Sequence, residues 1–179
     1  MRLPPLVEAL AGATIGETFN FYRDGPGAEL RRGRLRAYLE AREHACLALV
    51  GEAAGYRGAR VSGIPFTSER QVSGGDPCES TATIVRAVLA ELGIEEETVL
   101  WNVVPTHPHL PGRPDTNRRP TRAEIVASAP YLAAVADSRR VVAVGRIAAS
   151  VLSAPSVRHP SHGGATHFRE GLRKVIGRH

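Results

Sequence analysis

Three short apolar runs mark the chain, each rich in Val and Leu and each ending at a Gly, Pro or polar residue. They are ACLALVGE at 45–52, TVLWNVVP at 98–105 and RVVAVG at 140–145. Unbroken apolar runs of this length are typical of parallel strands that are buried on both faces. We therefore predict three buried strands, with a further short strand near residues 156–158.

Between these runs, apolar positions recur at helical spacing. Segment 78–94 carries one apolar stripe made of Ile84, Val85, Val88, Leu89 and Leu92. Gly93 follows this stripe, and glycine commonly closes a helix. Thr121 precedes Glu124 by three residues, the spacing of a capping box, which predicts a helix over about 120–138. Further helices are expected over 29–43 and 146–152, and from about residue 166 onward.

Alternating strands and helices predict an α/β fold in which helices cover both faces of a parallel sheet. The 179 residues, 42% of them hydrophobic and 23% charged, fit one domain spanning 1–179. Two long segments, 53–78 and 105–120, show neither the apolar spacing of a helix nor that of a strand, and are expected to be irregular. Loops this long in a compact domain are usually functional or disordered.

Arginine dominates the formal charge of +5, because Lys174 is the only lysine among 23 basic residues. The planar guanidinium suits phosphates and base edges, which favours a nucleic-acid partner. A preference for arginine over lysine also accompanies GC-rich genomes, so charge alone leaves both readings open.

Cys46 and Cys78 are the only cysteines, and two cysteines cannot build a four-cysteine zinc or iron–sulfur site. No stretch has the pattern of a signal peptide or a membrane span. We expect a cytoplasmic protein with free thiols and no membrane partner.

Polar residues follow the predicted strands where the carboxyl ends of a parallel sheet bind ligands. Segment 51–55 leaves the first strand, Asn102 lies near the end of the second and His159 follows the last. Asn offers a donor and an acceptor side by side, which suits a pyrimidine edge, and His can donate to an oxygen that gains negative charge. Phe66, in the loop GIPFTSE, can stack on a planar ligand.

Five blocks, in this order and at this spacing, resemble the uracil-DNA glycosylase superfamily over about residues 46–172: LVGEAAG, SGIPFTSE, VLWNVVPTHPHLPGRP, VVAVGRIAASVL and RHPSHGG. The resemblance is strongest to branches whose first motif reads GEAPG or GLAPA. It implies a three-layer α/β/α sandwich with a four-stranded parallel sheet. It also implies a monofunctional, monomeric enzyme without a cofactor, which hydrolyses the N-glycosidic bond of deoxyuridine in single-stranded or mispaired DNA, releasing free uracil and leaving an abasic site.

The resemblance assigns roles to individual residues. Asn102 would read the uracil edge and reject cytosine, Phe66 would stack on the flipped base, and His159 would donate to uracil O2 as the base leaves. The backbone around Gly51, Ala53 and Gly55 would line the sugar and the base.

The first motif departs from the best-known branch at two positions. Ala53 stands where that branch has the Asp that orients water, so Glu69 and Glu52 become the candidates for this role, with Glu69 slightly favoured. Gly55 replaces a Tyr that excludes the thymine methyl group, which leaves the pocket open to 5-substituted uracils unless Tyr56 fills the gap.

The resemblance also bears on DNA contacts. The segment Ser161, His162, Gly163 and Gly164 matches the loop that inserts a side chain, often leucine, into the space of the flipped base; here that position is Gly163. Arg118 and Arg119 are the candidates for phosphate contacts, within a group that includes Arg113 and Arg122; an ordinary solvated face is the alternative.

A metal is not expected. Thr106 and Ser128 stand where related branches place iron–sulfur cysteines, and the histidines His107 and His109 lack a nearby cysteine partner. Two other functions remain open. One is a weak or inert relative that binds damaged or abasic DNA, which Ala53 suggests, and the other is a hydrolase of free nucleosides or nucleotides.

Overall fold

A parallel four-stranded sheet in the order β2-β1-β3-β4 forms the centre of the molecule. The computed structural model describes residues 3–177. The strands are β1 (Leu47–Ala53), β2 (Thr98–Val104), β3 (Arg140–Val144) and β4 (Ser156–Val157). Every residue of β2 is buried, as its continuous apolar run predicts.

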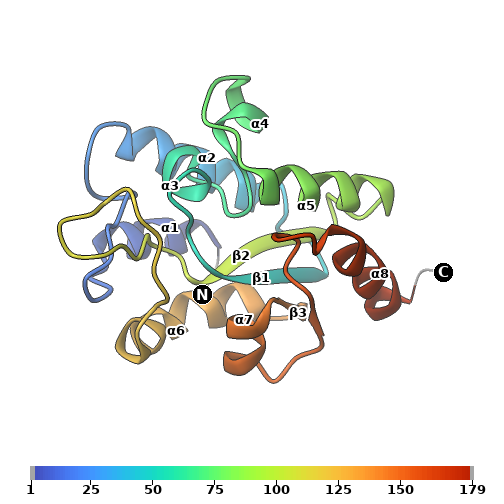
Figure 1. Ribbon diagram of the computed structural model, residues 1–179. Coiled ribbons are helices and arrows are strands. Elements are labelled where there is room, and N and C mark those ends of the chain that lie inside the picture. Colours follow the sequence, from blue (N-terminus) through green and yellow to red (C-terminus); the bar gives the residue numbers. More distant parts are fainter. Residues whose placement is uncertain (1–2, 178–179) are drawn as a thin grey trace.

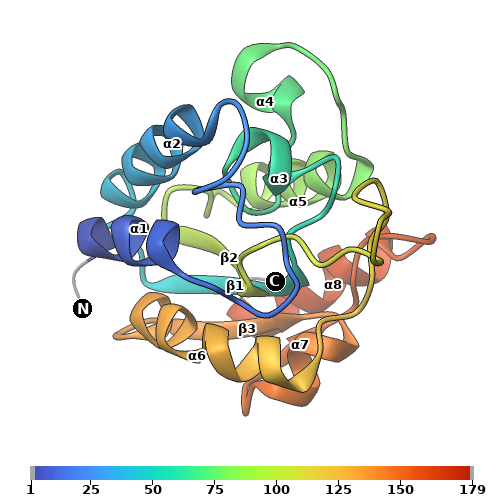
Figure 2. The ribbon, with the colours of Figure 1, turned by 90° about the vertical axis from the view of Figure 1, so that its left-hand side faces the viewer.

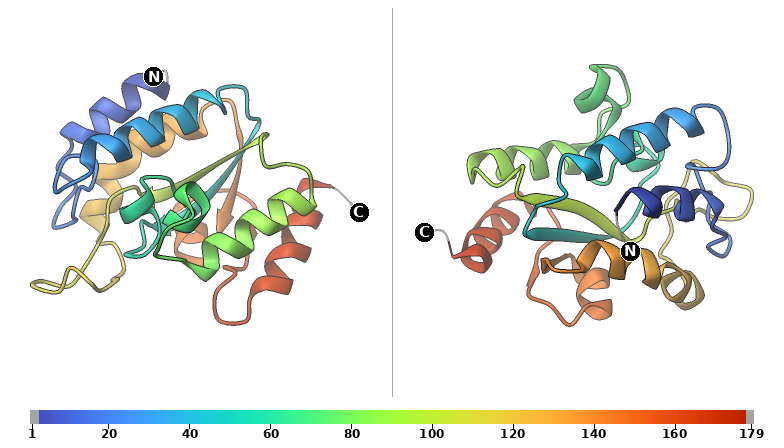
Figure 3. Two further views of the ribbon diagram at one scale, coloured as in Figure 1. Left: turned by 90° about the horizontal axis from the view of Figure 1, so that it is seen from above. Right: turned by 180° about the vertical axis from the view of Figure 1, so that it is seen from behind.

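Helices cover both faces of this sheet (Figures 1 and 3). On one side lie α2 (Ala28–Glu40), α3 (Ala59–Ser62) and α5 (Ser80–Glu91), with α4 (Glu69–Ser73) outside them. On the other lie α6 (Arg122–Ala136) and α7 (Arg146–Val151), and α8 (Ala165–Ile176) packs beside β4. The predicted α/β/α sandwich with a four-stranded parallel sheet is confirmed.

Helix α1 (Leu3–Gly12) packs against α2 and α6, beside the sheet (Figure 2). The sequence did not predict it, nor the short helices α3 and α4 inside segment 53–78. Neither of these two helices is long enough to show a period, and tertiary contacts hold them. Arg34 of α2 donates to the Ser62 carbonyl in α3 at 3.3 Å and to the Glu69 carboxylate in α4 at 2.8 Å. No helix of the described part of the chain is long and apolar enough to cross a membrane.

The predicted helix ends are confirmed. Gly93 adopts the left-handed conformation after α5, with φ +63°, and its N–H donates to the Ala90 carbonyl. At the start of α6, Thr121 Oγ1 accepts the Glu124 N–H at 3.2 Å and Glu124 accepts the Thr121 N–H at 2.8 Å. Both backbone N–H groups of the capping box, those of Thr121 and Glu124, therefore have an acceptor.

Candidate active site

A cavity of about 1120 Å³ opens at the carboxyl ends of the strands. Each strand contributes at least one lining residue: Glu52 and Ala53 from β1, Asn102 from β2, Val144 from β3, and Ser156 and Val157 from β4. The sheet thus brings together residues that lie about a hundred positions apart in sequence, as the topology of a parallel sheet requires.

Phe66 and Asn102 line this cavity, and both lie against Gly51. Phe66 has φ +51°, a conformation that side-chain-bearing residues rarely adopt, and its ring is 8% exposed. Gly51 pairs with Asn102 across the sheet, and a Cβ on Gly51 would lie 2.3 Å from Phe66 Cζ and 3.0 Å from Asn102 Oδ1. An aromatic ring and an amide therefore meet over a position that only glycine can occupy.

His159 also lines the cavity, and its ring has a defined proton position. The Ser161 N–H donates to His159 Nδ1 at 3.2 Å, and Ser161 Oγ lies 2.8 Å from the same nitrogen. Burial lowers the pKa of His159, with a smaller contribution from His162, so the neutral form is favoured. Because Nδ1 accepts, Nε2 carries the proton, and no residue of the described chain accepts it.

The two carboxylates predicted to orient water have different environments. Glu52 lines the cavity; burial raises its pKa, and the charge of Arg119 opposes this shift. Glu69 does not line the cavity. Arg34 of α2 holds both of its oxygens at 2.8 and 2.9 Å, and Ser73 donates to one of them at 2.7 Å. The Arg34 hydrogen bonds hold the pKa of Glu69 below its usual value.

Sequence reasoning missed a third carboxylate. Glu79, directly before α5, lines the cavity beside Gly55 and Gly58, and burial raises the pKa of its carboxyl group. In the sequence this position looks like an ordinary residue at a helix start, so no local signal identifies it.

Tyr56 does not fill the gap beside Gly55. Its ring lies under the Arg60 guanidinium at 4.4 Å and near the His107 ring at 5.9 Å, outside the cavity lining. Glu79 Oε1 occupies this gap instead, 3.0 Å from where a Cβ on Gly55 would lie.

The loop after β4 brings Ser161 and His162 to the cavity rim. His162 and Gly163 both have positive φ, +53° and +73°, and a Cβ on Gly163 would meet nothing within 4 Å. Gly164 is different, because a Cβ there would lie 2.1 Å from the His159 carbonyl oxygen. Neither glycine lines the cavity itself.

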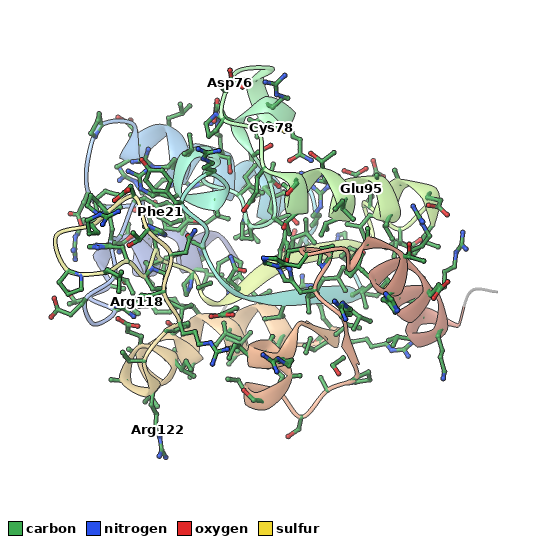
Figure 4. The ribbon with its side chains drawn as sticks, in the orientation of Figure 1. Phe21, Asp76, Cys78, Glu95, Arg118 and Arg122 are labelled. Carbon is green, nitrogen blue, oxygen red and sulfur yellow. The ribbon has the colours of Figure 1, made fainter. Side chains whose placement is uncertain are left out.

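Of the four arginines that the sequence suggested for phosphate contacts, two are paired with carboxylates, one points away from the molecule and one lines the cavity without a carboxylate partner within residues 3–177. Arg118 lies at the cavity, but Glu124 holds its guanidinium at 2.6 and 2.8 Å, and Arg113 pairs with Asp115. Arg122 projects from the start of α6 away from the molecule (Figure 4). Arg119 lines the cavity, together with Arg146 and Arg158, which the sequence did not single out.

The histidines of loop 105–120 lie close to backbone carbonyl groups. His107 is fully buried, with Nδ1 at 2.9 Å from the Ala54 carbonyl oxygen and Nε2 at 3.2 Å from that of Pro114. Within residues 3–177, no group of three or more His, Cys, Asp or Glu side chains is placed to hold a metal ion. Both cysteines are exposed and free.

Comparisons with known proteins agree with this architecture. The structure is similar to the crystal structure of wild-type SMUG2 from Pedobacter heparinus, with a TM-score of 0.71 and 11% sequence identity, covering 99% of this chain and 97% of that chain. At this identity the likeness concerns the fold alone. No curated protein matches the chain. The family model of the uracil DNA glycosylase superfamily matches residues 40–176, most of the chain. The chain therefore belongs to the uracil DNA glycosylase superfamily.

Proposed function

We propose that the protein is a DNA repair enzyme that hydrolyses the N-glycosidic bond of deoxyuridine in DNA, releasing uracil and leaving an abasic site. One observation carries this proposal. An aromatic ring, an amide and a neutral imidazole line one cavity, and these are the kinds of group that stack on, pair with and donate to a pyrimidine with two carbonyl groups. Membership of the superfamily supports the same reaction class.

In this proposal Phe66 and Asn102 hold the base. The Phe66 ring stacks on the pyrimidine plane, and the Asn102 amide pairs with the N3–H and O4 of uracil. Asn102 is 4% exposed, so its amide has little contact with water. Cytosine reverses the donor and acceptor pattern at these positions, and it would leave the amide unsatisfied.

His159 acts on the leaving group. As the C1′–N1 bond stretches, negative charge accumulates on the pyrimidine ring, and the Nε2–H of His159 donates to O2. One such donor in a buried site supplies about 3 kcal/mol to the transition state. Because the ring is already neutral and fixed by Ser161, little reorganisation is needed at that step.

DNA is bound at the cavity rim. Arg119, Arg146 and Arg158 supply positive charge there. The loop from Ser161 to Gly164 faces the bound DNA strand in this proposal. Arg118 is paired with Glu124, so in this proposal it holds the loop around it in place and does not contact a phosphate. The enzyme acts in this proposal as a monomer and without a cofactor, on single-stranded or mispaired DNA, where extruding the base costs least.

A panel of labelled oligonucleotides tests the proposal. Uracil is placed in a single strand, opposite guanine and opposite adenine, and strand cleavage is measured after alkali treatment. We expect alkali-sensitive sites from the single-stranded and U·G substrates, together with free uracil. Absence of both at high enzyme excess contradicts the proposal.

Two outcomes of the same panel would support other functions. Tight binding to an abasic oligonucleotide without base release would favour an inert binding relative, for which Ala53 is the motivating residue. Release of uracil from free deoxyuridine, with none from DNA, would favour a nucleoside hydrolase.

A further inference from the structure

The Glu79 side chain lies at the start of a helix but does not cap it. Glu79 is the N-cap residue of α5, a position that favours Ser, Thr, Asp and Asn, whose short side chains accept a backbone N–H. The Glu79 side chain accepts no such hydrogen bond from α5. Its backbone is nevertheless fixed, because the Glu79 carbonyl accepts from Thr83 N–H and Thr83 Oγ1, both at 3.1 Å. Helix capping therefore does not explain why this residue is a glutamate.

The carboxylate fills the gap beside Gly55 instead. A Cβ on Gly55 would lie 3.0 Å from Glu79 Oε1, and one on Gly58 would lie 2.1 Å from Oε2. Within residues 3–177, and apart from the two chain neighbours of Gly55, no other residue has an atom within 4 Å of that Gly55 position. Non-bonded carbon atoms pack about 3.5–4.0 Å apart. While Glu79 occupies this gap, an additional methyl group does not fit into it.

The gap lies on the β2 side of the cavity, away from His159. The loop that leaves β1 stays beside β2, since Ala54 N–H donates to the Val104 carbonyl at 3.3 Å. His159 packs at the end of β3, where a Cβ on Gly145 would lie 3.2 Å from His159 Cβ. Because β1 separates β2 from β3 in the sheet, the carboxylate and the imidazole lie at different parts of the sheet edge.

The pyrimidine ring determines which of its atoms faces this gap. C5 lies opposite C2 in the six-membered ring and next to C4. In the proposed function O2 faces His159 and O4 faces Asn102 of β2. The base then turns C5 away from His159 and toward the β2 side of the cavity. Uracil carries a hydrogen at C5, and thymine carries a methyl group there.

We propose that the Glu79 side chain determines which base enters the cavity: its volume admits uracil and excludes bases with a substituent at C5, such as thymine. This inference rests on the proposed function. Glu52 also lines the cavity, but none of its atoms lies within 4 Å of the Gly55 position. Tyr56 does not line the cavity. The position of the side chain thus distinguishes Glu79 from the other candidates for this role.

The test measures the release of uracil and of thymine from matched oligonucleotides in which either base is placed opposite guanine. Single-turnover rates are compared for the wild type, Glu79→Ala and Glu79→Gln. Glu79→Ala empties the gap, and we expect its thymine release to rise, so that the preference for uracil over thymine falls by about 10- to 200-fold, as for one methyl-sized group in a pocket. Glu79→Gln keeps the size of the side chain, so its preference should stay within about threefold of the wild type. Glu96→Ala, an exposed residue beyond the other end of α5, is the control and should leave both rates unchanged.

The outcomes separate this inference from the proposed function. A wild type that releases neither base contradicts the proposed function, and this inference with it. An active wild type that releases thymine as fast as uracil overturns the role of Glu79 alone, and so does a Glu79→Ala variant whose thymine release does not rise. An equal rise in Glu79→Gln would also overturn it, because the volume of the side chain is then not what excludes the methyl group. If Glu79→Ala does not fold, Glu79→Ser takes its place, since serine is short and is favoured at a helix N-cap; unchanged thymine release in that variant also overturns the inference.

Discussion

The Phe66 ring packs directly on the backbone of Gly51, so closely that a single added methyl group would lie 2.3 Å from Phe66 Cζ. The strained backbone of Phe66, at φ +51°, is what brings the ring there. Since such a conformation is costly, the contact indicates a position set by the requirements of the site rather than by core packing alone.

Gly51→Ala is therefore expected to displace the ring and to slow uracil release by about 100-fold, as misplacements of about 1 Å do at active sites. Gly33→Ala in α2 is the control, because a Cβ there meets nothing within 4 Å. Rates on a single-stranded uracil oligonucleotide and melting curves of both variants check this. Equal rates in Gly51→Ala and Gly33→Ala would show that the ring is not part of the base pocket.

Replacing His159 by Ala removes the Nε2–H donor and should reduce the rate of release by about 100- to 1000-fold. Ser161→Ala should cause a smaller loss, because the Ser161 backbone N–H still fixes the ring. Circular dichroism is expected to be unchanged in both variants. A larger effect from Ser161→Ala than from His159→Ala would contradict the donor role of His159.

Glu124→Ala tests the buried ion pair with Arg118. Glu124 is 1% exposed, and its removal leaves the Thr121 N–H without its acceptor and the Arg118 guanidinium without its carboxylate, with only the His109 and Arg119 carbonyl groups left to accept from it. We expect the free energy of unfolding to fall by about 3 kcal/mol, measured by urea denaturation. Asp115→Ala, which breaks the exposed pair with Arg113, is the control and should change stability little. A small effect from Glu124→Ala would show that the loop ending at Arg118 does not depend on this pair.

Much of the fold follows from local patterns, and for that reason the sequence predicted it. The run TVLWNVVP, the stripe ending at Gly93 and the capping box at Thr121 each depend on residues within one element, and the structure contains all three elements. The placement of Glu52, Asn102 and His159 at one cavity also followed, because the carboxyl ends of parallel strands meet at the same edge of the sheet.

The carboxylates could not be assigned in the same way. Glu69 pairs with Arg34, a residue 35 positions earlier on α2, and no local sequence pattern predicts that contact. Glu79 depends on two glycines more than twenty positions before it, and Arg118 on a glutamate that sequence reasoning had assigned only to helix capping. Each of these outcomes is decided by tertiary packing, which a one-dimensional pattern does not contain.

Stability should fall as the solution becomes acidic, and His107 should contribute to this. Burial lowers the pKa of His107 in the folded protein, outweighing its contacts with the Ala54 and Pro114 carbonyl groups. Below the ordinary value of 6.5 the unfolded chain therefore binds more protons than the folded one, and the free energy of unfolding decreases with falling pH. His107→Gln should lose less stability than the wild type between neutral pH and pH values below 6.5. Equal losses in urea denaturation would contradict this role.

Arg119→Ala should weaken DNA binding and flatten its salt dependence. Loss of one phosphate contact lowers the slope of log K against log salt by about 0.7 for a single strand. Arg122→Ala is the control, since this side chain points away from the molecule (Figure 4). Titrations of a fluorescent oligonucleotide at several salt concentrations measure both slopes. An unchanged slope in Arg119→Ala would place the phosphates elsewhere on the rim.

The open space around Gly163 has a consequence for how damage is found. If the protein acts as proposed, no side chain at Gly163 fills the gap left by an extruded base, and the protein would recover little of the stacking energy that is lost when a base leaves the duplex. The weakness of the damaged pair must then provide most of the selection. A mispaired or unpaired uracil would leave the base stack spontaneously, and the cavity would bind it afterwards.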